Sequence, residues 1–266
     1  MTWTTRPRSR LSSGLTAIRA GTGDPVILIH GVGLNADSWG AQIDALAKRF
    51  SVTAIDLPGH GQSKRLVAYA GMEDWVDTIA AGLAEIAPPY RIAGHSLGAL
   101  LTLHLAVRYP DLCERLALLN TIHRRSPKAA SAVKARARAL RDNGRSDPVP
   151  TLERWFGADL DSAPARACRT WLETVDAPAY AEAYALFAEG DSPPDDALAG
   201  LACPALFLTG AAEPNSTPAM SEELAALVPK GRALIVPDAA HMAMMTHPAT
   251  VNGALIDFFT GPQTEG

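Results

Sequence analysis

The chain has 266 residues, of which 47% are apolar and 20% are charged, and its formal net charge is −4 at pH 7. This composition is that of an ordinary globular protein and excludes disordered and collagen-like classes, and the charge balance gives no reason to expect a nucleic acid as partner. No stretch approaches the about eighteen apolar residues of a membrane-spanning helix. The basic residues at positions 6–10 are not followed by an apolar run before Pro25, so no secretory signal is expected. The sequence therefore predicts a folded cytoplasmic protein without a membrane segment.

Three cysteines, Cys113, Cys168 and Cys203, lie far apart in the chain and form no CxxC pair. An odd number at such spacing argues against a disulfide framework and against a thiolate metal site. We therefore expect buried free thiols. Nothing else in the sequence calls for a metal ion or an organic cofactor, so neither is expected.

Short apolar segments rich in branched side chains alternate with longer helical patterns. The expected strands are residues 25–30, 51–56, 90–95, 115–120, 205–210 and 232–237. The expected helices lie near residues 38–49, 72–87, 97–109, 217–228 and 247–260. Most of the strand segments are continuously apolar, which is typical of strands covered on both faces, and the alternation indicates crossover units. The sequence therefore predicts the α/β class, with a mostly parallel central sheet flanked by helices.

One interval, residues 121–200, interrupts this alternation. It contains no convincing strand, only Ala-rich helical stretches punctuated by SP, NG, DP and PP. Parallel sheets bind ligands at the carboxyl ends of their strands, so a helical insertion between two late strands is expected to cover that end as a lid. We therefore predict a core domain of residues 1–120 and 201–266 and a helical lid of residues 121–200.

The stretch YRIAGHSLGAL, residues 90–100, carries the strongest chemical signal. It places the G-x-S-x-G motif of Gly94, Ser96 and Gly98 between an apolar strand and an apolar helix, which is the context that this motif requires. Ser96 at so sharp a turn adopts a strained backbone, and side chains at the two glycine positions would collide with the neighbouring strand and helix. Its hydroxyl then projects from the end of the sheet, where the N–H of Leu97 points toward the position of an oxyanion. Ser96 is the predicted nucleophile, against the alternative of a structural Gly-rich turn.

A nucleophilic serine needs a general base, and the chain has seven histidines. Of these, His241 lies in the loop that leaves the last predicted strand, at the carboxyl edge of the sheet. His30 and His60 lie in Gly-rich loops, where a hydrogen bond that braces the turn is the simpler interpretation. His95 neighbours the nucleophile and is expected to point away from it. We therefore assign the base to His241.

These features together resemble the α/β-hydrolase fold superfamily. The segments that carry the resemblance are LIHGVGLNADSW (28–39), DLPGHGQS (56–63), GHSLGA (94–99), the strand and loop at 205–218, and His241. The order Ser, acid, His is also that of this fold. Within the superfamily, ERWFG (153–157), the Arg-rich helix before it and the run NSTPAM resemble 3-oxoadipate enol-lactonases and their relatives. The resemblance implies that the HG-x-G turn supplies a second oxyanion N–H, which in this sequence belongs to Val32.

The resemblance also implies an orienting acid three residues after the glycine that closes a late strand, a position that holds Glu213. Either carboxylate can accept from the imidazole and hold its tautomer, so Glu can stand where Asp is expected. Three alternatives rank below it. Asn120 ends the preceding strand, where some relatives place the acid, but carries no charge. Asp238 would have to fold back sharply to reach His241, and Asp56 heads a turn whose backbone N–H groups it is expected to brace.

Basic residues form a stripe on the first helix of the lid. Lys134, Arg138, Arg141 and Arg145 are spaced by four, three and four residues. The simplest interpretation is a solvated face paired with the acidic segment 146–200. The alternative is that Arg138 or Arg141 faces inward and binds a substrate carboxylate, as a dicarboxylate lactone requires. Trp155 and Phe156 belong either to the lid core or to the wall of the pocket.

The sequence as a whole predicts a serine hydrolase that cleaves a small-molecule ester or lactone. Ser96 attacks the acyl carbonyl, His241 moves the proton and Glu213 orients the imidazole, while the Val32 and Leu97 N–H groups hold the oxyanion. A serine rather than an aspartate nucleophile disfavours dehalogenase and epoxide hydrolase chemistry. Carbon–carbon bond hydrolysis, thioester hydrolysis and cofactor-free perhydrolysis use the same triad and remain open, as do a slow ligand-binding receptor of the same fold and the oligomeric state.

Overall fold

The computed structural model describes residues 3–66, 70–144 and 147–261. Within these residues the chain forms an eight-stranded sheet in the order β1-β2-β4-β3-β5-β6-β7-β8. The strands are β1 (Ser9–Arg10), β2 (Thr16–Ala20), β3 (Pro25–Ile29), β4 (Ser51–Asp56), β5 (Tyr90–His95), β6 (Cys113–Leu119), β7 (Ala205–Gly210) and β8 (Gly231–Val236). Strands β3 to β8 pair in parallel, whereas β1 and β2 pair antiparallel. The predicted mostly parallel sheet is thereby confirmed.

The strands β1 and β2 are an addition to those predicted from the sequence. β1 has two residues, and β2 (TAIRA) mixes small, polar and charged side chains, so neither shows an apolar periodicity. Antiparallel pairing with β4, from Thr16 opposite Asp56 to Ala20 opposite Val52, defines β2 instead. Tertiary pairing, rather than local propensity, decides the strand state here.

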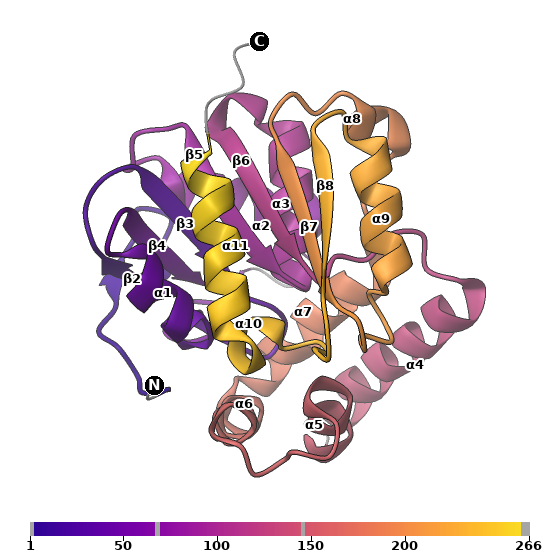
Figure 1. Cartoon of the computed structure of the whole chain (residues 1–266). Coiled ribbons are helices and arrows are strands. Elements are labelled where there is room, and N and C mark those ends of the chain that lie inside the picture. Colours follow the sequence, from indigo (N-terminus) through magenta and orange to yellow (C-terminus); the bar gives the residue numbers. More distant parts are fainter. Residues whose placement is uncertain (1–2, 67–69, 145–146, 262–266) are drawn as a thin grey trace.

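Helices cover both faces of the sheet (Figure 1). The core helices are α1 (Gly40–Leu46), α2 (Met72–Leu83), α3 (Leu97–Arg108), α9 (Pro218–Leu227), α10 (Ala243–Thr246) and α11 (Pro248–Thr260). Helices α1 and α11 lie side by side on one face, and α2 and α3 pack together on the other. Because both faces are covered, every residue of the central strand β5 and of β7 is buried, which explains why the strand segments read as continuous apolar runs.

Between β6 and β7 the described part of the chain forms helices and no strand. These helices are α4 (Pro127–Asn143), α5 (Val149–Phe156), α6 (Ala163–Thr174), α7 (Ala177–Glu189) and α8 (Asp195–Ala199). Helices α4 to α7 gather beyond the carboxyl ends of the parallel strands, whereas α8 lies near the opposite end of the sheet, where β7 begins (Figure 1). Helix α4 packs against α7. Ser126 caps the N-terminus of α4, because its hydroxyl accepts from the Ala129 N–H, and Pro127 occupies the first helical position. The insertion therefore covers the edge of the sheet where ligands bind in this class of fold.

The cysteines are free thiols: Cys113 and Cys168 are buried, and Cys203 is half-buried. Burial raises the pKa of all three, that of Cys203 to about 11. Among the residues described, no group of His, Cys, Asp and Glu side chains is placed to hold a metal ion. None of the described helices is long and apolar enough to cross a membrane.

Candidate active site

Ser96 occupies the turn between β5 and α3. Its backbone has φ 54° and ψ −116°, a region that is unfavourable for a residue other than glycine. A Cβ at Gly98 would lie 2.1 Å from the carbonyl oxygen of Ile29, and a Cβ at Gly94 would lie 2.4 Å from that of Gly98. Both flanking positions therefore require glycine, because the strand and the helix approach each other closely on either side of the strained turn at Ser96.

Glu213 and His241 meet at the edge where β7 and β8 end. Glu213 Oε2 lies 2.7 Å from His241 Nδ1, and the two side chains are 0% and 10% exposed, respectively. The second oxygen, Oε1, accepts from the backbone N–H groups of Asn215 at 2.7 Å and Ser216 at 3.3 Å. The structure thus brings together the acid and the base that the sequence predicts.

The protonation state of Glu213 decides the tautomer of His241. Burial opposes ionisation of Glu213, but the charge and hydrogen bond of His241 and the two amide donors outweigh it and hold the pKa of Glu213 below its usual value. An ionised carboxylate only accepts hydrogen bonds, so Nδ1 of His241 carries the hydrogen, and in the neutral form of the ring Nε2 presents a lone pair. This is the tautomer that can remove a proton from a serine hydroxyl.

Two of the weaker candidates for the acid, Asn120 and Asp238, do not contact the imidazole of His241. Asn120 donates from Nδ2 to Glu213 Oε2 at 3.3 Å and lies 3.2 Å from Thr209 Oγ1, so it supports the carboxylate rather than replacing it. This contact is not predicted from the sequence, although the adjacency of β6 and β7 places the end of one strand beside the loop that follows the other. Asp238 is exposed, and in the described structure the carboxylate that contacts His241 is that of Glu213.

The predicted oxyanion donors lie beside Ser96. Val32 and Ser96 line the same cavity, and a Cβ at the preceding Gly31 would lie 3.1 Å from the Ser96 Cβ. Leu97 is the first residue of α3, where helix N–H groups lack intrahelical partners. Across the described ranges, neither the Val32 nor the Leu97 N–H donates to another protein group. Both donors are therefore available to a negatively charged oxygen.

Two buried histidines brace the loop after β3. His30 accepts at Nε2 from the Leu57 N–H at 2.9 Å and donates from Nδ1 to the Gly31 carbonyl at 2.8 Å. His60 accepts at Nε2 from the Gly33 N–H at 3.1 Å. Burial lowers the pKa of both rings, that of His30 to about 3, so both stay neutral and keep the acceptor nitrogen that these amides need. Their expected bracing role is borne out by these contacts.

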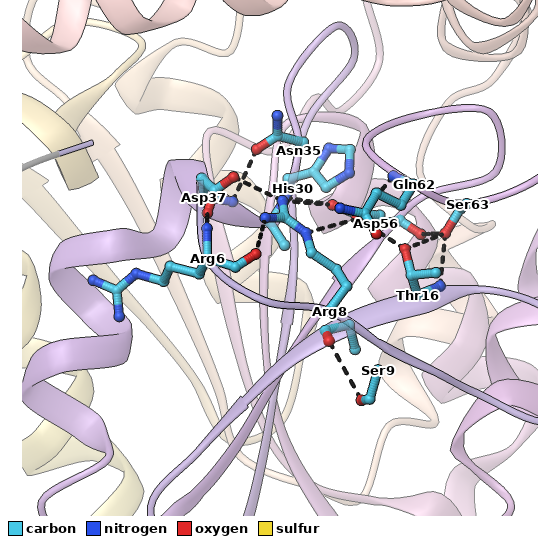
Figure 2. Close-up of polar contacts among 12 residues, drawn as sticks. Arg6, Arg8, Ser9, Thr16, His30, Asn35, Asp37, Asp56, Gln62 and Ser63 are labelled. Atoms are coloured by element: carbon cyan, nitrogen blue, oxygen red, sulfur yellow. Dashed lines mark hydrogen bonds and ion pairs between the residues drawn. The ribbon is translucent and has the colours of Figure 1, made fainter. Parts of the chain in front are cut away.

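Asp56 is the centre of a buried polar network beside the same loop (Figure 2). Its carboxylate accepts from the Ala36 N–H and the Thr16 hydroxyl, each at 2.8 Å, and lies 3.1 Å from Nε of Arg8. Arg8 also lies 2.8 Å from Asp37, and none of these charged side chains is more than 3% exposed. The network ties the segment before β1 to the loops that follow β3 and β4, which is the bracing function expected of Asp56.

We expect Arg8→Met to lower the free energy of unfolding by about 3 to 5 kcal/mol at pH 7, because it leaves two buried carboxylates without their cation. Burial opposes ionisation of Asp56, but the hydrogen bonds from Arg8 and Ala36 outweigh it and hold the pKa of Asp56 below its usual value. A depressed pKa contributes stability that is present above the unfolded value and lost as pH falls through the folded value. Wild type should therefore lose this contribution below about pH 4.

Urea unfolding at several pH values measures this effect. The matched control is Arg19→Met, which removes an arginine whose ion pair with Glu85 is partly exposed and should change little. A loss of similar size in both variants, or a loss in Arg8→Met that does not shrink in acid, would contradict the assignment of the network to stability.

Ser96 and His241 line a cavity of about 300 Å³ under the lid. Most of the rest of its wall comes from the lid, including the aromatic residues Trp155, Tyr180, Tyr184 and Phe187 and the arginines Arg125, Arg136 and Arg154. Trp155 thus lies at the wall of the cavity, one of the two positions predicted for it. Because the lid supplies these side chains, it determines which molecule fits beside Ser96.

Arg138 and Arg141 do not line this cavity, which agrees with the solvated face and corrects the alternative that one of them faces a substrate. They are exposed on α4 and border a separate groove between α4 and α7, and Arg145 lies outside the described residues. Arg136 lines the cavity instead, three residues after Val133, which also lines it. Residues three apart share a helix face, so the informative signal was the spacing of arginine from the apolar stripe rather than the spacing among the basic residues.

Three arginines give the cavity positive charge. Arg125 donates to the carbonyl oxygens of Gly190 and Phe187 at 2.7 and 2.9 Å, and its guanidinium lies 4.3 Å from the centre of the Phe187 ring. Burial lowers the pKa of Arg154, and the charge of Arg136 lowers it further. None of the ion pairs found among the described residues involves Arg125, Arg136 or Arg154. Such a cavity favours an anionic ligand.

The strand order, the turn at Ser96 and the positions of Glu213 and His241 after successive strands define an α/β hydrolase. The chain belongs to the alpha/beta hydrolase family, whose model matches residues 26–254. The protein therefore belongs to a family of hydrolases, and the superfamily resemblance seen in the sequence is confirmed.

Individual relatives show the range of the family around this chain. The (E)-2-((N-methylformamido)methylene)succinate hydrolase of Acinetobacter baylyi is 39% identical over 250 residues, which are 92% of this chain and 95% of that protein. The pimeloyl-[acyl-carrier protein] methyl ester esterase of Chromobacterium violaceum is 31% identical, over 85% of this chain and 91% of the esterase. The solved structure of the enol-lactonase from Burkholderia xenovorans LB400 is 26% identical in sequence and superposes with a TM-score of 0.80. The match covers 96% of this chain and 100% of the lactonase. The likeness to enol-lactonases is thereby confirmed.

Proposed function

We propose that this protein is a serine hydrolase that cleaves an ester or lactone bond in a small substrate bearing a carboxylate. One observation carries the proposal: Ser96 and His241, which is bound by Glu213, line a cavity whose lid wall holds three arginines without carboxylate partners among the described residues. The serine and its partners supply acyl transfer chemistry. The arginines supply recognition of an anion.

The first half of the reaction forms an acyl-enzyme. His241 Nε2 takes the proton of the Ser96 hydroxyl as the oxygen attacks the acyl carbon, and the carbonyl oxygen becomes negative. The N–H groups of Val32 and Leu97 stabilise that oxygen. When the tetrahedral intermediate collapses, the bond to the leaving oxygen breaks and His241 returns the proton to it, so charge and protons balance.

The second half releases the acid. A water molecule gives a proton to His241 and attacks the acyl carbon, and the proton then returns to Ser96 as the acyl–oxygen bond breaks. Glu213 keeps His241 in the required tautomer throughout and stabilises the imidazolium that forms in each half.

A second candidate is an amide-type bond in a substituted methylenesuccinate. The 39% identity with the Acinetobacter baylyi enzyme favours it, because that enzyme's name describes a substrate with a succinate dianion and a formamido group. The same acyl transfer applies, with nitrogen as the leaving atom protonated by His241. The three cavity arginines suit this dianion as well as a lactone acid.

A substrate panel tests the proposal. Methyl esters, lactones, thioesters, N-acyl enamines and carbon–carbon hydrolase substrates are each compared with and without a free carboxylate, together with a perhydrolysis assay. The proposal expects the highest kcat/KM for a carboxylate-bearing ester or lactone; a preference for the enamine favours the second candidate. Indifference to the carboxylate would contradict the recognition step, and failure of a fluorophosphonate to label Ser96 would favour a receptor of this fold.

We expect Arg136→Gln to raise KM for carboxylate-bearing substrates by about 10- to 100-fold, which is the contribution of a hydrogen bond to a charged group. Neutral esters should be little affected, because Arg136 does not participate in proton transfer. Steady-state kinetics on a matched pair, an ester with and without a free carboxylate, measures the difference. The control is Arg138→Gln, two residues along the same helix but on its exposed face; an equal effect of the two substitutions would show that the charge of α4, and not a cavity contact, is responsible.

A further inference from the structure

The imidazole of His241 contacts groups from three elements of the structure. Glu213, after β7, holds Nδ1 at 2.7 Å. His95, at the end of β5, donates from Nε2 to the His241 carbonyl oxygen at 2.9 Å, and the two ring centres are 4.8 Å apart. Trp155, in the last turn of lid helix α5, stacks on the His241 ring with centres 5.7 Å apart and planes inclined by 22°. The lid therefore touches the ring of the base itself, and not only the substrate cavity.

The groups near His241 include one neutral histidine, one carboxylate and the arginines of the cavity. Burial, followed by the charge of His241, lowers the pKa of His95 to about 3, so His95 stays neutral and adds no positive charge. The cavity that His241 faces holds Arg125, Arg136 and Arg154, and these cations disfavour another cation beside them. The carboxylate of Glu213, at 2.7 Å, is thus the charged group that contacts the His241 ring.

The indole of Trp155, stacked on this ring, interacts more favourably with an imidazolium than with a neutral imidazole. The face of an indole ring attracts a cation that lies within about 6 Å of the ring centre, and the Trp155–His241 separation of 5.7 Å satisfies that condition. A neutral imidazole feels much less of this attraction. The contact therefore strengthens when the base takes the proton of Ser96, and only interactions that strengthen in this way lower the barrier.

We propose that Trp155 is a positioning residue through which the lid tunes the catalytic base: its indole stacks on His241 and stabilises the imidazolium formed in each half of the reaction. This inference rests on the proposed serine mechanism. Because Trp155 and its neighbour Phe156 both pack against the hydrophobic core, the base has its full environment only when α5 is packed over it. The lid thus contributes to the rate of acyl transfer as well as to the choice of substrate.

The test uses the rate at which a small alkyl fluorophosphonate labels Ser96, measured across pH. In this reaction the Ser96 oxygen bonds to phosphorus, fluoride leaves and His241 takes the hydroxyl proton, so the rate reports the base without a carboxylate ligand. Trp155→Leu should lower the labelling rate on the plateau by about three- to tenfold. It should also move the midpoint of the acidic limb to lower pH by about half a unit to one unit, because the protonated form loses a favourable contact. Trp155→Phe, which keeps an aromatic face, should restore most of both properties.

Phe156→Leu is the matched control, because it removes the neighbouring aromatic residue of the same helix, which does not line the cavity. It should label like wild type. A Trp155→Leu variant with the plateau and midpoint of wild type would overturn the inference, and a midpoint that moves to higher pH would show that the indole only excludes water. Absence of labelling in wild type would instead reject the serine mechanism.

A fluorescence titration keeps the inference testable even if Trp155→Leu does not fold. A protonated imidazole quenches the emission of a stacked indole. The emission of wild type minus that of Trp155→Phe should therefore decrease as the pH is lowered, with the same midpoint as the labelling rate of wild type. A difference that stays flat through the acidic limb would overturn the proposed contact.

Discussion

Ser96→Ala should lower kcat by about 10⁴- to 10⁶-fold, the loss seen when the nucleophile of such a triad is removed. In the proposed mechanism the hydroxyl oxygen forms the acyl-enzyme. No neighbouring side chain in the described site can replace it, because His95 is neutral and donates to a backbone carbonyl and His241 is held by Glu213. The remaining rate should come from the oxyanion donors and the cavity, which the substitution leaves in place.

Hydrolysis of a short nitrophenyl ester measures the loss, and labelling by a fluorophosphonate followed by intact mass measures the site. Urea unfolding provides the control for folding, and it should show no loss of stability, because the φ of 54° at position 96 is as unfavourable for Ser as for Ala. If the variant kept its esterase rate, the proposed mechanism would be wrong.

Glu213→Gln should lower kcat by about 10³- to 10⁴-fold with little change in KM. The carboxylate accepts from Nδ1 of His241, whereas a carboxamide can turn its NH₂ group toward that nitrogen and stabilise the tautomer with the hydrogen on Nε2. That tautomer cannot take a proton from Ser96. The amide donors at Asn215 and Ser216 can still bind the remaining carbonyl oxygen, so the loop and the fold should persist.

The matched control for Glu213→Gln is Asp238→Asn, which alters the other acidic residue near His241. Asp238 is exposed, so this variant should retain wild-type kinetics. Near-complete activity in Glu213→Gln, or a steep loss in Asp238→Asn, would move the orienting acid away from Glu213. Nuclear magnetic resonance of the imidazole nitrogens would show the change of tautomer directly.

The main features of the candidate catalytic site follow from the sequence because each candidate residue lies shortly after a recognisable strand. Ser96 follows β5, Glu213 follows the glycine that closes β7, and His241 follows β8 by a short loop. Parallel strands place their carboxyl ends at one edge, so the order of the elements was enough to predict that these three side chains lie together. The G-x-S-x-G motif also predicted the strained turn at Ser96, because glycine at both flanking positions indicates that there is no space for a side chain there.

The lid is less predictable from the sequence than the core. The Ala-rich segments predict that the lid is helical. They do not predict which face of α4 is directed toward the cavity, because the basic and the apolar residues form adjacent stripes on this helix. Packing of Ala137 and Leu140 sets the rotation of the helix. This rotation places Arg136 at the cavity that Ser96 also lines and leaves Arg138 and Arg141 exposed. The cavity is therefore lined by Arg136 rather than by Arg138, two positions further along, because α4 packs against α7, a helix distant in the sequence.

The sequence by itself determined the fold class, the strained serine and the chain order of serine, acid and histidine, because all of these depend on local steric rules and on strand order. The tertiary structure decided the antiparallel strands β1 and β2, the buried Arg8–Asp37–Asp56 network, the arginines of the cavity and the stacking of Trp155 on His241. The physical reason is the same in each case. These features depend on contacts between residues far apart in the chain, whose geometry is set by packing and not by local pattern.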